Sequence, residues 1–541
     1  MLIRKKPPRP HALGEPLLHQ NHPRPVTRRD FFAAGFLSGG AMVIGPAWLG
    51  ALLRSGRANA QQTTPLDGDI AALLTSAECA VPSAGAGVSF ICFDLAGGAN
   101  LVGSEVLVGQ QGGQSSFLST AGYELLGVPG NLVPTSSANI DPSLGLLWHA
   151  DGAIKRGILS KATTPATAAR TNGAVLCAES QNDTQSNPHN PMYGIAMAGA
   201  QGELLTLIGT ESSVSGGNSM APPMLVNPAL QPTTISQPSD ATALVPIPPG
   251  GTQDPLSVAV LESQTRISGG TGSYNNGAGG TAAFTGALAT PGAQLYTSPA
   301  QDAALKNQVR CSYVKAANTA SIFGSPAALD PTQDQLITGG ATPIFTMADF
   351  QDSDVAATAT VMKMVLDGYA GAGTITMGGY DYHDGTRATG ETRNFKAGQM
   401  IGAVLEYAQR KGKPVMVYVF SDGSLNSNMM VDSSAAGRGK LGWQGDNSSV
   451  ASTFFLVYSP KGRPALLNGA AGQQIGYFSA DGNVVSSSSP VGNAVTTLVG
   501  AVILNYMGLM GTTAQYAAKF PMLPLGSTSQ LDALTVFQPI V

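Results

Sequence analysis

The sequence has little charge for its size. Charged residues occupy 11% of its 541 positions, against 43% hydrophobic residues, a balance that allows a large buried core and argues against disorder. The first sixty positions hold nine of the 29 basic residues and two of the 33 acidic ones, so the remainder has a net charge of −11. A remainder this acidic, without a cluster of Lys or Arg, argues against nucleic acid and anionic lipid as partners.

Cysteine and histidine are also scarce. The four cysteines form no Cys-x-x-Cys pair, so the usual signal for zinc or thioredoxin chemistry is missing. They allow three disulfide pairings, between which the sequence does not choose, and Cys92 lies in an apolar run where we expect it to be buried and free. Beyond the first sixty residues the histidines are His149, His189 and His383. These are too few for a histidine-rich dinuclear zinc centre, although a site of mostly oxygen ligands for calcium or magnesium stays open.

Past residue 60 the sequence lacks a segment that is long and apolar enough to span a membrane. The nearest approach, residues 494–510, contains Asn505. We therefore expect a buried helix there, and no transmembrane segment once the N-terminal region has been removed.

The N-terminal sixty residues have the pattern of an export signal. The pair Arg28-Arg29 precedes an apolar run over 31–53, and an Ala-x-Ala site ends at Ala60. This order is typical of a signal peptide, and the arginine pair is typical of the twin-arginine route, which carries folded proteins. A membrane anchor is the alternative, because about 20 apolar residues can span a bilayer, but five glycines in the run weaken a permanent helix. We expect residues 1–60 to be a twin-arginine signal peptide, the twin-arginine translocation machinery to be a partner, and the mature protein to be periplasmic or secreted.

In the rest of the chain, short apolar runs alternate with segments of helical spacing. The predicted strands are 88–93, 374–377, 414–420 and 453–458, and the predicted helices are 352–369, capped by Asp352 or Ser353, and 395–410, ended by Gly412. Strands and helices that alternate in this way predict a βαβ sheet with helices on both sides, in an α/β fold. We expect one large domain over 61–541, with a loop-rich insert around 200–340 where proline and glycine are frequent.

Polar side chains lie where ligands of open α/β sheets gather, at the carboxyl ends of predicted strands. In an extended segment, Asp381 and His383 project to the same side, and a carboxylate beside an imidazole suits a metal; a loop in which both bind the backbone is the alternative. Asp422 directly follows the strand 414–420, Asp446 precedes the strand 453–458, and Asp94 ends the first strand. Asp422 is followed by Gly423, and Asp446 by Asn447. Both pairs are common in turns, so an ordinary turn is the alternative to a site at each place.

The chain resembles the bacterial family known as domain of unknown function 1501, whose members are exported by the twin-arginine route and are related to alkaline phosphatases and sulfatases. The segment Gly379-Tyr380-Asp381-Tyr382-His383 resembles the family's Gly-Phe-Asp-Thr-His motif, and Ser421-Asp422 resembles its Ser-Glu pair. His189 lies where the histidine of a Ser-His-Phe motif is expected. The similarity covers about 88–200 and 345–515.

The chain departs from the family pattern at two motifs that carry polar groups. Asn100 stands where an Asp is expected, and Asp446-Asn447 stands in place of Asp-His. Losing a carboxylate and an imidazole weakens a metal site, and no Ser or Thr is recognisable as a nucleophile.

The resemblance implies an alkaline-phosphatase-like three-layer sandwich around a mixed, mostly parallel sheet. It implies a metal-dependent hydrolase of phosphate or sulfate esters, with Ca, Mg or Zn as the cofactor and an active site that has lost some of the usual residues. Asp381, His383 and Asp446 are then expected as metal ligands, and Asp422 and His189 as catalytic acid–base groups. The alternative is a non-catalytic binding or assembly protein of the cell envelope, with an envelope protein rather than a small ester as its partner.

Overall fold

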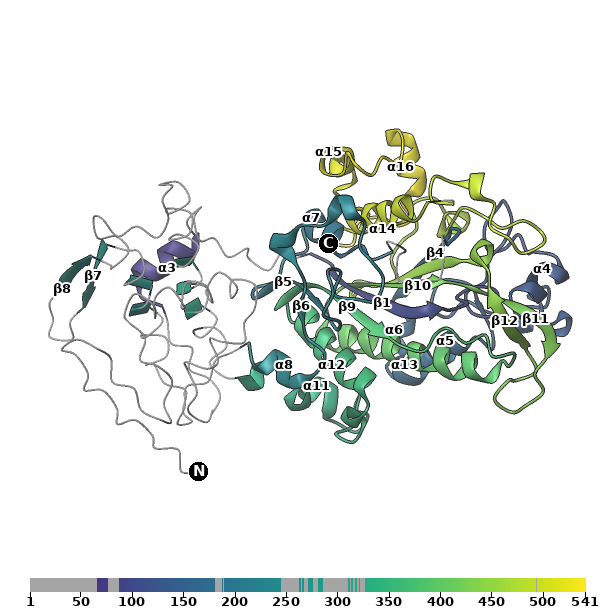
Figure 1. Cartoon of the computed structure of the whole chain (residues 1–541), viewed down its shortest axis with the longest axis horizontal. Helices are drawn as coiled ribbons and strands as arrows, with labels where there is room; N and C mark the ends of the chain where they lie inside the picture. Colours follow the sequence, from purple (N-terminus) through teal and green to yellow (C-terminus); the bar gives the residue numbers. More distant parts are fainter. Residues whose placement is uncertain are drawn as a thin grey trace, which may run out of the picture.

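The computed structural model describes residues 66–75, 87–180, 187, 189–244, 326–492 and 494–541, with scattered positions between 262 and 321. An eight-stranded sheet forms its centre, in the order β14-β4-β13-β10-β1-β9-β5-β6 (Figure 1). The strands are β1 Ser89–Gly98, β4 Thr171–Cys177, β5 Leu205–Gly209, β6 Thr233–Thr234, β9 Ala370–Met377, β10 Val415–Gly423, β13 Ser452–Tyr458 and β14 Gln474–Ile475. All run parallel except β13, which is antiparallel to both of its neighbours. The expected mixed, mostly parallel sheet is confirmed.

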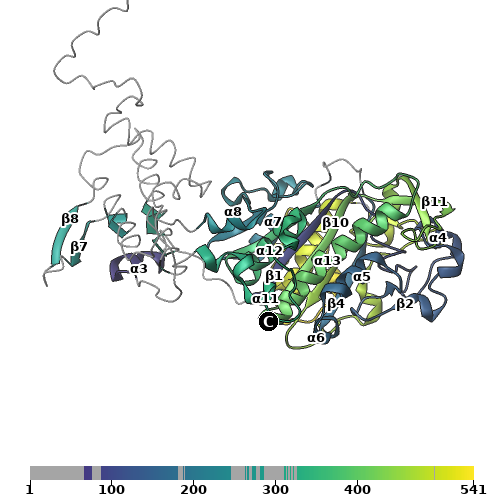
Figure 2. The same ribbon diagram turned by 90° about the horizontal axis from the view of Figure 1, so that it is seen from below.

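Helices cover both faces of this sheet, as predicted (Figures 1 and 2). One face of β1, with Ile91 and Phe93, packs in a core with the helices α5 Ala153–Lys161, α12 Ser353–Leu366 and α13 Ala388–Lys411. The other face, with Phe90 and Cys92, packs in a second core with α7 Met192–Ala198 and α14 Val495–Leu509. Because both faces are buried, the central strands are mostly apolar. All nine residues of β10 are buried, including Ser421 and Asp422 at its carboxyl end.

The remaining elements are shorter. They are α3 Gly68–Thr75, α4 Thr120–Leu125, α6 Pro165–Ala169, α8 Pro238–Thr242, α11 Gln335–Thr338, α15 Tyr516–Lys519 and α16 Thr528–Leu534, with the strand pairs β2 Ile140–Asp141 and β3 Trp148–His149, β7 Thr271–Asn275 and β8 Thr281–Thr285, and β11 Leu425–Val431 and β12 Leu441–Asp446. The hairpin β11–β12 continues directly from the carboxyl end of β10 and carries Asp446 at its base.

The predicted helices are present, but α12 ends at Leu366 instead of 369 and the start of α13 differs more. Asp352 caps α12 by accepting a hydrogen bond from the backbone nitrogen of Asp354, and Gly412 ends α13 in the left-handed conformation, with φ 62°. However, α13 begins at Ala388 rather than at 395. Its first turns are polar, so they show no apolar stripe, yet Arg387 and Glu391 are buried there as an ion pair.

The region expected as a loop-rich insert contributes to the sheet. Leu205–Gly209 forms β5, an inner strand between β9 and β6. Five residues are too few for a periodic pattern to be recognised against the glycine-rich surroundings. The loop-rich insert expected around 200–340 therefore begins with two strands of the central sheet, β5 and β6, while much of 245–325 lies outside the described residues.

The prediction for Cys92 is confirmed. Cys92 is buried and free, as expected; Cys177 is likewise free and buried, and Cys311 forms a disulfide. Residues 494–510 form α14, which is almost wholly buried. None of the described helices is both long and apolar enough to cross a membrane. The predicted signal peptide 1–60, with Arg28 and Arg29, lies outside the described residues.

Candidate metal site

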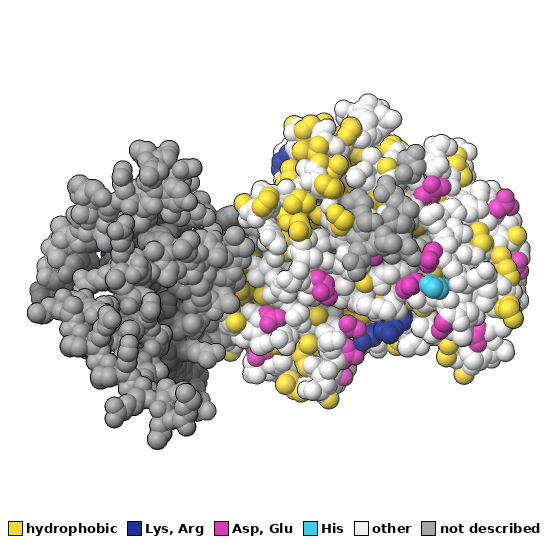
Figure 3. All heavy atoms as spheres, viewed as in Figure 1, with side chains coloured by type: hydrophobic (Ala, Val, Ile, Leu, Met, Phe, Trp, Pro, Cys, Tyr) yellow, Lys and Arg dark blue, Asp and Glu magenta, His cyan; other side chains and the backbone are white. Residues whose placement is uncertain are grey.

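Three exposed side chains converge at the carboxyl edge of the sheet. One ligand atom each from Asp381, His383 and Asp446 lies within 4.8 Å of the other two, and Nε2 of His383 is 2.9 Å from Oδ1 of Asp381. The structure thus brings together the three residues that the sequence predicts as metal ligands. Figure 3 shows a histidine flanked by acidic side chains on this face.

The backbone that carries Asp381 and His383 is positioned by alternating burial. Tyr380 and Tyr382 are buried while Asp381 and His383 are exposed, as expected for an extended segment whose side chains point alternately to opposite sides. The segment lies against Gly97 at the end of β1, where a Cβ would come within 2.6 Å of the Asp381 nitrogen. Gly97 has φ +114°, so only glycine allows both this turn and this close approach.

Asp446 reaches the same place from the hairpin. It pairs with Leu425 in the β11–β12 ladder, and its Oδ1 lies 3.7 Å from the Cβ position of Gly98. The Gly97–Gly98 turn is itself held by Ser421, whose hydroxyl donates to the Gly97 carbonyl at 2.6 Å and accepts from the Ala99 nitrogen at 2.9 Å. Ser421 is therefore a structural residue of the turn that separates Asp381 from Asp446.

The donor set fits a divalent ion. Two ligand atoms that each lie about 2.1 Å from a tetrahedral ion are about 3.4 Å apart, so the present spacing requires movements of roughly an ångström in side chains that are exposed. Two carboxylates and one imidazole suit zinc or manganese better than calcium, which prefers an all-oxygen shell. Metal binding would replace the direct contact between His383 and Asp381 by a bond from each to the ion.

Asp94 and Asp422 lie together in a second, buried cluster. The backbone nitrogen of Ser219 donates to Asp94 at 2.7 Å, its hydroxyl contacts carboxylate oxygens of both aspartates, and Asn218 donates to Asp422 at 2.8 Å. Burial has the largest effect on the pKa of Asp94 and raises it, together with the negative charge of Asp422, to about 7. The hydrogen bonds from Ser219 act in the opposite direction. The Ser219 hydroxyl has one proton and cannot donate it to both carboxylates at once. The cluster is therefore stabilised when one of the two carboxyl groups is itself protonated.

His189 lies beside that cluster in the fold but is not one of the three converging ligands. Its ring stacks on Phe420 of β10, with centroids 5.8 Å apart, and neither ring nitrogen has a hydrogen-bond partner among the described residues. Burial lowers the pKa of His189 to about 4. At neutral pH it is therefore an uncharged imidazole. Its predicted catalytic role, and that of Asp422, stay predictions.

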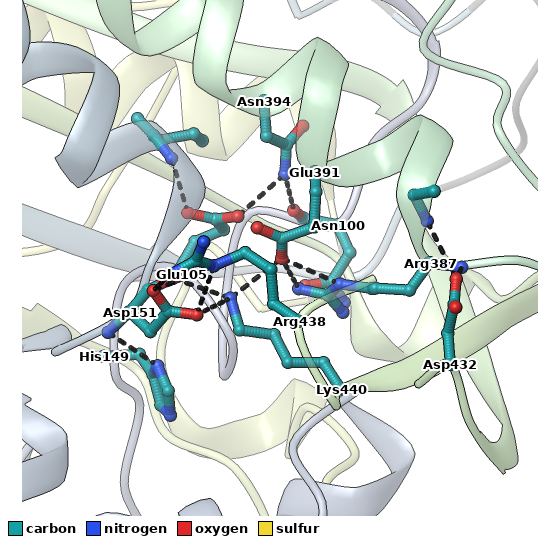
Figure 4. A network of polar contacts seen from close by, with 12 residues as sticks. Asn100, Glu105, His149, Asp151, Arg387, Glu391, Asn394, Asp432, Arg438 and Lys440 are labelled. Atoms are coloured by element: carbon teal, nitrogen blue, oxygen red, sulfur yellow. Dashed lines mark hydrogen bonds and ion pairs between the residues drawn. The ribbon is translucent and has the colours of Figure 1, made fainter. Parts of the chain in front are cut away.

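A buried ionic network joins α13 to neighbouring segments of the chain (Figure 4). Glu391 lies at its centre: its Oε1 is 2.8 Å from Nζ of Lys440 and 2.9 Å from Nη2 of Arg387, and its Oε2 is 2.6 Å from Nη2 of Arg156. Burial tends to raise the pKa of Glu391, but the neighbouring positive charges outweigh it and hold the pKa below its usual value. Glu105, also buried, has its pKa raised to about 7 by desolvation and by the charge of Glu391.

Asn100, Tyr382 and Asn394 connect this network to the metal site. The Tyr382 hydroxyl accepts from the Asn100 nitrogen at 3.0 Å and donates to Oδ1 of Asn394 at 3.1 Å. Asn394 in turn donates to Glu105 at 3.0 Å. Asn100 is fully buried and its amide donates to the Leu425 carbonyl, so in this chain it joins β1 to the hairpin rather than facing the exposed ligands.

Sequence reasoning missed Ser219, Asn218, Tyr382 and the ionic network. Ser219 ends the segment Ser215-Gly-Gly-Asn-Ser219 directly after β5, and a glycine-rich turn after a strand was the available signal. The network had no local signal, because Asn394 and Glu105 are 289 residues apart in the chain.

Comparisons with known proteins found no matching family model, curated protein or solved structure.

Proposed function

We propose that this chain is an exported, metal-dependent hydrolase of phosphate or sulfate esters, with an alkaline-phosphatase-like fold related to the domain of unknown function 1501 family. The observation that carries the proposal is the convergence of Asp381, His383 and Asp446, from two separate segments, at the carboxyl edge of a mostly parallel sheet. Ligands of open α/β sheets bind at that edge. A divalent ion held there would supply Lewis-acid polarisation of the ester.

The residues of the chain would have separate roles in such a site. The two carboxylates would balance the charge of the ion, and the imidazole of His383 would complete the donor set. Gly97 and Ser421 would keep the segments of Asp381 and Asp446 at a constant separation. Because all three ligands are exposed, an ester would reach the ion from solvent without an opening movement.

Replacing Asp381 by alanine is expected to weaken Zn²⁺ binding by at least about 100-fold, since loss even of a group that only supports a ligand costs 10- to 100-fold. Arylphosphatase or arylsulfatase turnover should fall with it. Zn²⁺ titration calorimetry and turnover of aryl esters measure both effects. Asp481→Asn, at an exposed aspartate outside the group, is the control and should change neither. If the wild-type protein binds no divalent ion and turns over no ester, the proposal is wrong.

A non-catalytic envelope protein is the second candidate function. It is favoured by the engagement of Asp94, Asp422 and Asn100 in internal hydrogen bonds, which leaves them less available for chemistry. For this candidate the same experiment has a different outcome: Zn²⁺ binds and Asp381→Ala abolishes binding, but neither ester is hydrolysed.

Export by the twin-arginine route is part of the proposal. Replacing Arg28 and Arg29 together by lysine is expected to retain most of the protein in the cytoplasm, because the pair is the recognised element of the signal. Fractionation and immunoblotting of the two forms measure this. An unchanged periplasmic fraction would show that the protein uses another route.

A further inference from the structure

Arg393 contacts the turn that directly precedes the segment of Asp381 and His383, and it has no acidic partner among the described residues. It is an exposed residue of α13, and its Nη1 makes one long contact, of 3.4 Å, to the Gly378 carbonyl. Lys396, one turn further along α13, pairs with Asp352 and Asp354, and Arg387 is committed to Glu391. In Figure 3 basic side chains lie near the histidine and its acidic neighbours.

The turn that follows β9 places the guanidinium over Gly379, close in the chain to Asp381. Gly379 has φ +84°, and a Cβ there would come within 2.8 Å of Cζ of Arg393. The guanidinium therefore occupies the space that a side chain at 379 would take, two residues before Asp381. Around the Cβ position of Gly378 there is nothing within 4 Å, so this side of the turn has room for a ligand.

The charges define which ligand fits. An imidazole binds a metal ion without its proton, so a divalent ion bound by two carboxylates and one imidazole would have no net charge left. Arg393 would then add an unbalanced positive charge. A guanidinium presents paired N–H donors that match two oxygens of a phosphate or sulfate group. Without the ion, the two carboxylates would repel such an anion.

We propose that Arg393 binds the tetrahedral oxyanion of the substrate, the phosphate or sulfate group, next to a divalent ion held by Asp381, His383 and Asp446. This inference rests on the proposed function. It adds the residue that recognises the anionic group and requires anion binding to depend on the metal.

Calorimetric titration of inorganic phosphate and of sulfate into the Zn²⁺-loaded protein, freed of excess Zn²⁺, tests the inference. Arg393→Gln is expected to weaken anion binding about 10- to 100-fold, the usual effect of losing charged hydrogen bonds, with Zn²⁺ affinity unchanged or slightly higher. Arg393→Lys should restore part of the affinity. Arg463→Gln is the control, because this exposed arginine binds only backbone carbonyls, of Ser143, Ala168 and Ala169, and it should behave as wild type.

The outcomes separate the two proposals. If the wild type binds no Zn²⁺, the metal site and this inference both fall. If Zn²⁺ binds but Arg393→Gln binds the anions as tightly as wild type, if the metal-free protein binds them equally well, or if neither anion binds, the inference alone is overturned. A clear preference for one of the two anions would support the inference and identify the ester class.

Discussion

Replacing Glu391 by glutamine is expected to lower the free energy of unfolding by about 3–5 kcal/mol, the usual cost of removing one partner from a buried ion pair. Its carboxylate is 4% exposed and contacts Arg387 and Lys440, which are 1% and 0% exposed. A neutral amide would leave these two buried cations with less compensating charge. Urea denaturation at pH 7 of the wild type and the variant measures the difference.

Two further variants test whether the loss is electrostatic. Glu203→Gln, at a half-buried glutamate, should change the free energy of unfolding by no more than about 0.5 kcal/mol. The double variant Glu391→Gln with Lys440→Gln should lose less than the sum of the two single variants, because the second change removes a charge that the first left uncompensated. A loss below about 1 kcal/mol for Glu391→Gln would show that the network contributes little to stability.

Replacing Asp94 by asparagine is expected to stabilise the protein at alkaline pH and to change little near pH 4. The folded-state pKa of Asp94 is about 7, above its ordinary value of 3.8. The folded protein therefore holds this proton more tightly than the unfolded chain. The resulting stability is fully present below about pH 4 and is lost progressively as the pH rises to about 7. Asparagine reproduces the protonated carboxyl, since its oxygen can accept from the Ser219 nitrogen while its amide donates to the Ser219 hydroxyl.

The free-energy difference between the Asp94→Asn variant and the wild type should therefore grow by up to about 4 kcal/mol between pH 4 and pH 7 and remain constant above pH 7, since three pKa units correspond to about 4 kcal/mol. Urea denaturation across this pH range measures it, and groups common to both proteins cancel in the comparison. Asp384→Asn is the control. Burial tends to raise the pKa of Asp384, but hydrogen bonds from Thr386 hold it below the usual value, so this variant should gain no stability at high pH. If the free energies of unfolding of the Asp94→Asn variant and the wild type differ by the same amount at every pH, the prediction is wrong.

The predicted metal ligands show what a local sequence pattern can predict and what requires the fold. Asp381 and His383 share an extended segment, so their common orientation follows from a period of two residues and could be predicted without the fold. Asp446 was grouped with them from the family resemblance, and the structure places it there through the hairpin β11–β12, which was not predicted. The contact of Asp446 with the Gly97–Gly98 turn depends on how this hairpin folds back over the end of β1.

The sequence by itself determined the layered α/β architecture, because long apolar strands and capped helices are encoded by residues close together in the chain. It also determined that Asp381 and His383 point to the same side, and it fixed the low charge of the chain. The tertiary structure alone decided that Asp94 and Asp422 share Ser219, that Glu391 is surrounded by buried cations, and that Arg393 lies over Gly379. Ser219 is 125 residues from Asp94 and 203 from Asp422, and Lys440 is 49 residues from Glu391. Arg387 and Glu391 are near in sequence, as are Arg393 and Gly379, but local spacing does not report that the first pair is buried or that the second pair meets. Burial and electrostatic interaction depend on distance in space, and no local period reports that distance.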